Sequence, residues 1–147
     1  MAIKLSTKSI ISQDVLREIG EARLEESKAL LDAGFYAGSV YLGGCSVECY
    51  LNVAVCVTLG WDELFATFKV HDLEGLLLYS GFNARLRADA DVADSFAKIR
   101  MLWRIEGDDD VRYRRPAEFD EPIAKRFLQY VSDPTMGVVS WLRIVTS

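Results

Sequence analysis

The chain has 147 residues, half of them apolar and 27% charged, a composition that excludes disordered and fibrous classes and can bury one core. Its 17 basic and 22 acidic residues give a net charge of −5, which disfavours the non-specific electrostatic binding of nucleic acid. We therefore expect a single domain over 1–147, with 1–11 as a loose N-terminal extension and with no DNA partner.

The N-terminal segment and the cysteines bear on the compartment. The segment MAIKLSTKSIISQD contains lysines but lacks an apolar run of signal-peptide length, so we expect no export. Cys45, Cys49 and Cys56 are an odd number within one apolar segment, which suits a reducing compartment better than a disulfide framework. The sequence therefore predicts a cytoplasmic protein.

The first predicted helix runs from about Ser12 or Asp14 to Ala33, and Gly34 is its expected left-handed stop. Apolar residues at three- and four-residue steps form one stripe along it, which we expect to face the core. The stripe consists of Val15, Ile19, Ala22, Ala29, Leu30 and Ala33.

The second predicted helix, Tyr36 to Leu59, is apolar on every face. It is long enough to cross a bilayer, but Glu48 lies in its middle as the only charged residue between Ala33 and Trp61. We interpret it as the central helix of a bundle, at which Gly43 and Gly44 allow a neighbouring helix to approach closely, and we expect no membrane partner.

The remaining elements complete an all-α, up-and-down bundle of five to seven helices, because no segment alternates cleanly enough to be a strand. They are a short turn or helix over Trp61–Phe65, a helix capped by Asp72 and ended by Gly81, one from near Arg85 or Asp91 to Gly107, one starting at Asp120 or Glu121, and a last one starting at Asp133.

Glu48 is the most informative residue, because burying a carboxylate in an apolar helix costs several kcal/mol unless it is paired or neutral. We expect it to meet His71, the only histidine, or the basic run of residues 112–115. Two interpretations stay open: a structural ion pair that fixes the helix register, or a polar groove. Asn52, one turn beyond Glu48 on the same face, favours the groove.

Other chemistries have weaker support. The cysteines could bind metal only together with His71, and no second closely spaced cysteine or histidine pair exists, so we interpret them as small buried hydrophobic residues and expect neither metal nor cofactor. The run Arg112-Tyr113-Arg114-Arg115 could contact RNA phosphates or stack on a base. The structural alternative is a loop clamped onto the acidic residues 108–110 or onto Glu48.

The segment DAGFYAGSVYLGGCSVECYL, residues 32–51, resembles the first half of a HEPN domain: a helix ends in a short turn, and the next helix carries small residues and then a glutamate. The resemblance continues at His71-Asp72-Leu73, at Trp103 and at Arg112-Tyr113. It implies a small helical bundle that is usually a homodimer. Many such proteins partner a minimal nucleotidyltransferase in toxin–antitoxin-like systems, and some are metal-independent ribonucleases.

The sequence departs from the family pattern at two places. Asn52 stands where the family has lysine, and the ribonuclease motif, an arginine followed four to six residues later by a histidine, is absent. No arginine lies in 64–70 before His71, and no histidine follows 112–115. Such a ribonuclease needs both groups at the scissile phosphate, so we assign no catalytic residue.

The resulting hypothesis is a non-catalytic HEPN-like interaction module, a homodimer that partners a nucleotidyltransferase or binds a nucleotide. The alternative is a metal-independent ribonuclease with an atypical site made from Arg112, Tyr113 and His71. The predicted polar cluster, with a ligand-binding or structural role, is Glu48, His71, Trp103, Arg112 and Tyr113. Secondary candidates are Asn52, Arg114 and Arg115.

Overall fold

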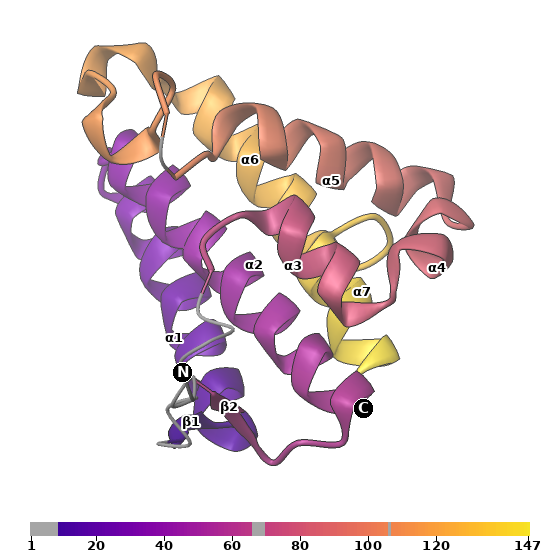
Figure 1. Ribbon diagram of the computed structural model, residues 1–147. Helices are drawn as coiled ribbons and strands as arrows, with labels where there is room; N and C mark the ends of the chain where they lie inside the picture. Colours follow the sequence, from indigo (N-terminus) through magenta and orange to yellow (C-terminus); the bar gives the residue numbers. More distant parts are fainter. Residues whose placement is uncertain (1–8, 66–69, 106) are drawn as a thin grey trace.

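The computed structural model describes residues 9–65, 70–105 and 107–147, and within these ranges the chain is a helical bundle with one small sheet (Figure 1). The all-α prediction is confirmed, with seven α-helices among the described residues. The helices are α1 (Gln13–Asp32), α2 (Tyr36–Leu59), α3 (Leu73–Ser80), α4 (Asn83–Arg87), α5 (Ala90–Leu102), α6 (Glu121–Ser132) and α7 (Val138–Val145). Two 3-10 turns, η2 (Val111–Tyr113) and η3 (Pro116–Glu118), precede α6, and two strands, β1 (Ser9–Ser12) and β2 (Glu63–Phe65), form the sheet.

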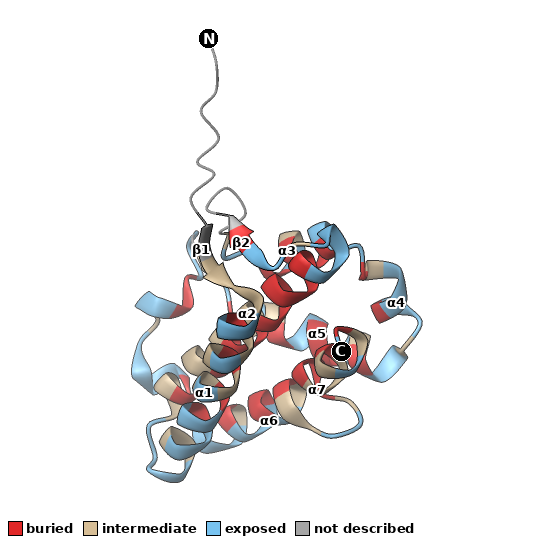
Figure 2. Ribbon diagram, turned by 90° about the horizontal axis from the view of Figure 1, so that it is seen from below, coloured by how far each residue is buried: buried red, intermediate tan, exposed pale blue. Residues whose placement is uncertain are grey.

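The central helix α2 has the bounds that its sequence predicts. Glycines in the left-handed region, Gly34 (φ +85°) and Gly60 (φ +66°), flank it and stop helical propagation on both sides. Helices α1, α3, α6 and α7 all pack against α2, so its buried residues form the middle of the core (Figure 2). Among the described residues it is the one helix long and apolar enough to span a membrane, yet most of it is buried within the bundle.

Helix α1 packs on α2 through a different face from the predicted one. Val15 is 43% exposed and the alanines of the predicted stripe also face solvent. The buried residues of α1 are Leu16, Gly20, Leu24 and Ser27. Contact between the helices depends on small residues: a Cβ at Gly20 would lie 3.0 Å from the Tyr50 ring, and Ser27 Oγ donates to the Ser39 carbonyl at 2.6 Å. A stripe of apolar residues does not reveal such a face, because glycine and serine contribute little hydrophobicity.

The two strands contradict three expectations. Ser9–Ser12 pairs antiparallel with Glu63–Phe65, so a strand exists, residues 63–65 are not helical, and residues 9–11 are not a loose extension. Residues 1–8 lie outside the described ranges. Strands of three and four residues are too short for alternation to be recognised, and their pairing joins segments far apart in sequence.

The middle of the chain is more divided than predicted. Asp72 caps α3 and Gly81 ends it, as expected. Of the two starts expected for the next helix, the one near Asp91 is confirmed, because α5 begins at Ala90 and is capped by Asp89. Arg85 lies in a separate short helix, α4. Helix α5 ends at Leu102, because the next residue, Trp103, takes an extended conformation and packs into the core.

Of the start positions predicted for the last two helices, the first is confirmed and the second is wrong. Asp120 caps α6, as expected, by accepting the N–H of Ile123. Asp133 instead caps a turn by accepting the N–H groups of Thr135 and Met136, and α7 begins only at Val138. An aspartate before proline favours a turn as well as a helix start, so the sequence signal is ambiguous there.

Candidate functional site

Glu48 and His71 are in contact at the surface of the bundle. The Nδ1 atom of His71, in the segment that leads into α3, lies 3.0 Å from the Oε1 atom of Glu48 on α2. The side chain of Glu48 is 18% exposed and that of His71 is 43% exposed. The carboxylate therefore does meet the histidine, but at the edge of the core, where water reduces the cost of its charge.

The pair borders a cavity of about 140 Å³, which we call the Glu48 cavity. Four of the five residues of the predicted cluster line it, and they come from α2, the segment before α3, the segment after α5, and η2. These four are Glu48, His71, Trp103 and Arg112. Residues widely separated in the sequence thus converge on one small space.

Trp103 forms a wall of this cavity through fixed contacts with α2. Its indole Nε1 donates to the carbonyl oxygen of Tyr41 at 2.9 Å, and its ring lies against Gly44, where any Cβ would overlap the indole. The ring of Tyr41 stacks on the indole, with centroids 6.5 Å apart. Because its N–H is satisfied and its ring is buried, Trp103 shapes the cavity rather than offering a free surface to a ligand.

Arg112 lines the cavity from a loop in which the carboxylate of Asp110 binds its guanidinium. Its Nε and Nη2 atoms donate to the two carboxylate oxygens of Asp110 at 3.0 and 2.7 Å. This bidentate hydrogen bonding raises the pKa of Arg112 above its usual value, so the guanidinium stays charged. Asp110 therefore holds the loop in place. This agrees with the structural interpretation of the basic run, in which the loop is clamped onto the acidic residues 108–110.

The other predicted residues lie elsewhere. Tyr113 is 81% exposed and borders a separate groove of about 580 Å³ together with Arg114 and Arg115. Arg114 contacts Glu118 at 3.5 Å. Asn52 is buried in α2, and its Oδ1 atom has no hydrogen-bond partner among the residues that the structure describes.

Sequence reasoning missed six residues that line the Glu48 cavity: Ile19, Arg23, Tyr41, Cys45, Cys49 and Ile105. Three of them were accessible to pattern reasoning, because Tyr41, Cys45, Glu48 and Cys49 recur at three- and four-residue steps along one face of α2. Arg23 lies on α1 and pairs with Glu26 at 2.7 Å. Its place depends on how α1 packs on α2, which the predicted stripe did not give correctly.

Burial and the nearby carboxylate determine the chemistry of the two cysteines. Desolvation, followed by repulsion from Glu48, raises the pKa of Cys45 to about 11 and that of Cys49 to about 12. Both thiols stay protonated near neutral pH and are poor nucleophiles. Within the described ranges, no group of three or more histidine, cysteine or acidic side chains could hold a metal ion.

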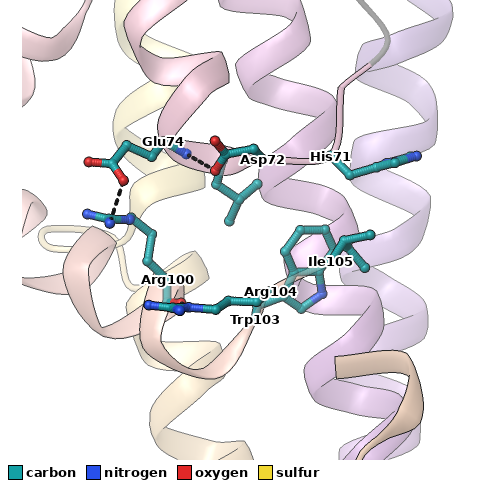
Figure 3. Close-up of a pocket in the computed structure, with 8 residues that line it drawn as sticks. His71, Asp72, Glu74, Arg100, Trp103, Arg104 and Ile105 are labelled. Carbon is teal, nitrogen blue, oxygen red and sulfur yellow. Dashed lines mark hydrogen bonds and ion pairs between the residues drawn. The ribbon is translucent and has the colours of Figure 1, made fainter. Parts of the chain in front are cut away.

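A second cavity, of about 260 Å³, lies on the other side of His71, and we call it the Arg104 cavity (Figure 3). It shares His71, Trp103 and Ile105 with the Glu48 cavity. Its other lining residues are Asp72, Leu73, Glu74, Arg100 and Arg104. Figure 3 shows the His71 ring directed away from this cavity, so the histidine divides the two spaces.

Comparison of the chain with protein-family models, with curated proteins and with solved structures finds no match. The resemblance to HEPN domains thus stays a prediction carried by the residues quoted above.

Proposed function

We propose that the chain is a non-catalytic, HEPN-like binding module that holds a nucleotide at the Glu48 cavity. The observation that carries this proposal is the convergence of Glu48, His71, Trp103 and Arg112 on one cavity. Scattered polar residues in apolar contexts gain little stability by meeting at a partly exposed edge, so a shared ligand is a better reason for their convergence.

The groups around the cavity suit a nucleotide. Glu48 accepts hydrogen bonds, while Arg23 and Arg112 donate them. Burial raises the pKa of Tyr41, so its hydroxyl stays protonated and can donate as well. Such a mixture matches a ligand with base edges, hydroxyls and negative charge.

The size of the space supports a ligand that occupies both cavities. Small-molecule sites usually enclose roughly 300–1,000 Å³, and the Glu48 cavity alone, at about 140 Å³, falls below that range. The Arg104 cavity, which adjoins it at the shared residues, has a volume of about 260 Å³. A nucleotide would therefore pass His71 and extend from one cavity into the other.

Calorimetry with the four common ribonucleosides and their 5′-monophosphates tests this proposal. We expect at least one nucleotide to bind the wild type, and Glu48→Gln to weaken it about tenfold or more through the loss of a charged acceptor. Glu18→Gln, an exposed position on α1, is the matched control and should bind as the wild type does. If none of the eight compounds binds the wild type, the nucleotide proposal is wrong.

A protein partner is the second part of the proposal: a homodimer that engages a minimal nucleotidyltransferase in a cytoplasmic toxin–antitoxin-like system. Its support is the apolar stripe of α1, including Val15, Ala22 and Ala29, which faces solvent instead of the core. Light scattering over a dilution series should report a dimer that Ala22→Glu converts to a monomer. A monomeric wild type at high concentration would exclude the homodimer.

One observation favours a ribonuclease as the alternative function. Glu48 contacts Nδ1 of His71 and so orients the imidazole, and Arg112 lines the same cavity, an arrangement that could transfer protons and stabilise a phosphate. Generic RNA is incubated with the wild type and with His71→Ala in the presence of a chelator. Cleavage that the variant lacks would establish this function, and equal absence of cleavage would reject it for that RNA.

A further inference from the structure

The Arg104 cavity places two guanidinium groups on one wall. Arg100 belongs to the last turn of α5, and Arg104 follows in the extended segment after the helix. The Nε atom of Arg104 donates to the carbonyl oxygen of Arg100 at 3.4 Å, which holds the two residues together. In Figure 3 both side chains lie on the side of the cavity opposite Asp72 and Glu74.

The carboxylates of this cavity already have partners. Glu74 binds Nη2 of Arg100 at 2.6 Å, and Asp72 accepts the backbone N–H of Glu74 at 3.2 Å as the cap of α3. Within the described part of the chain, Arg104 makes no ion pair, although acidic residues outnumber basic ones by 22 to 17. Among the described side chains, the wall therefore has one ion-paired and one unpaired guanidinium, while the Asp72 carboxylate keeps its charge on the opposite side of the cavity.

This arrangement favours an anion. The Arg104 guanidinium attracts an oxyanion, and Arg100, which gives Nη2 to Glu74, keeps further N–H donors for the same ligand. The planar fork of a guanidinium matches the spacing of oxygens on phosphate, so Arg104 can bind two of them at once.

We propose that the Arg104 cavity is an oxyanion site of the phosphate class, with Arg104 as its principal ligand and Arg100 as a second donor. The inference rests on the proposed function, since the two cavities adjoin at His71, and it makes the anion the phosphate of the nucleotide held beside Glu48. Free phosphate has the same chemistry, and the experiment distinguishes the two sources.

The experiment titrates sodium phosphate, the four nucleosides and their 5′-monophosphates separately into the full chain at constant ionic strength, without other oxyanions. The variants are Arg104→Gln, Glu48→Gln and, as the matched control, Arg126→Gln, an exposed arginine on α6 outside both cavities. Phosphate should bind the wild type and Arg126→Gln alike and bind Arg104→Gln about tenfold or more weakly, while Glu48→Gln should weaken the binding of a monophosphate. At least one monophosphate should bind more tightly than both phosphate and its own nucleoside.

The outcomes separate the two proposals. Failure of phosphate to bind the wild type, or equal binding by wild type and Arg104→Gln, overturns the oxyanion site whatever the nucleotides do. Arg104-dependent binding of phosphate without binding of any nucleotide supports the oxyanion site, with free phosphate as its ligand, and removes the proposed nucleotide function.

Discussion

Trp103 lies directly against Gly44 of the central helix, and its indole nitrogen donates to the carbonyl oxygen of Tyr41 three residues earlier. Since a Cβ at Gly44 would overlap the indole ring, Gly44→Ala must displace Trp103, a wall of both cavities. We expect the free energy of unfolding to fall by about 1–3 kcal/mol, measured by urea denaturation.

The same substitution in the same helix provides the control for Gly44→Ala. A Cβ at Gly38 meets only the flexible end of Leu30, at 3.1 Å, and alanine is the better helix former. Gly38→Ala should therefore leave stability near the wild-type value. Equal stability of both variants would show that Trp103 does not depend on the space at Gly44.

The contact between Glu48 and His71 sets the expected cost of removing the carboxylate. A fully buried pair loses about 3–5 kcal/mol when one partner is removed, but the His71 side chain is 43% exposed and water can solvate it. We therefore expect Glu48→Ala to reduce the free energy of unfolding by about 1 kcal/mol in chemical denaturation. A loss above about 3 kcal/mol would show that the pair is shielded from water.

Glu21 predicts how stability depends on acid. It accepts two hydrogen bonds of 2.7 Å from Arg143 and one from the hydroxyl of Tyr50, and chiefly the arginine lowers the pKa of its carboxyl below the usual 4.5. A lowered pKa gives stability that is present above pH 4.5 and is lost as the pH falls through the folded-state value.

Thermal unfolding of Glu21→Gln and of the wild type between pH 3 and pH 7 tests this. The wild type should be more stable near pH 6, by about 1 kcal/mol or less because the pair is partly exposed, and the difference should shrink below pH 4.5. Glu18→Gln on the same helix controls for the loss of a charge. A difference that does not change with pH would contradict the ion pair.

The thiols of Cys45 and Cys49 should react slowly with alkylating reagents. With pKa values of about 11 and about 12, each has at least about a hundredfold less thiolate at pH 8 than a thiol at the usual 9.0. Glu48→Gln removes the second cause of both shifts, so alkylation measured by mass spectrometry should become faster. Wild-type rates as high as those of the unfolded chain would show that the thiols are not desolvated.

The helical fold was predictable because its signals are local. The bounds of α2 follow from Gly34 and Gly60, and the caps of α3 and α6 follow from Asp72 and Asp120, each of which acts within a few residues. The buried face of α1 and the β1–β2 pair were not predictable in this way. They depend on close helix approach at Gly20 and on pairing between distant segments.

The composition of the candidate site was only partly predictable for the same reason. Glu48 and His71 stood out as single polar residues in apolar or unusual contexts, and they are in contact. Tyr113 was grouped with Arg112 because the pair Arg112-Tyr113 is one of the places where the sequence resembles HEPN domains, but successive residues of the η2 turn point in different directions, so Arg112 lines the cavity and Tyr113 faces solvent. No sequence pattern pointed to Arg104, because its neighbours in the cavity depend on where α5 ends and on how α3 packs beside it.

The pairing of Ser9–Ser12 with Glu63–Phe65 joins the amino-terminal strand to the segment that leads to His71. The strand Glu63–Phe65 precedes, by only a few residues, the histidine that separates the two cavities. Trimming the protein to Gln13 would remove the partner of that strand, and the packing of Leu64 on Leu16 and Val53 and the contact of His71 with Glu48 would be left to hold the described parts of the linker between α2 and α3. Ligand affinity would then depend on the presence of β1, so the protein used in binding studies should retain Ser9–Ser12.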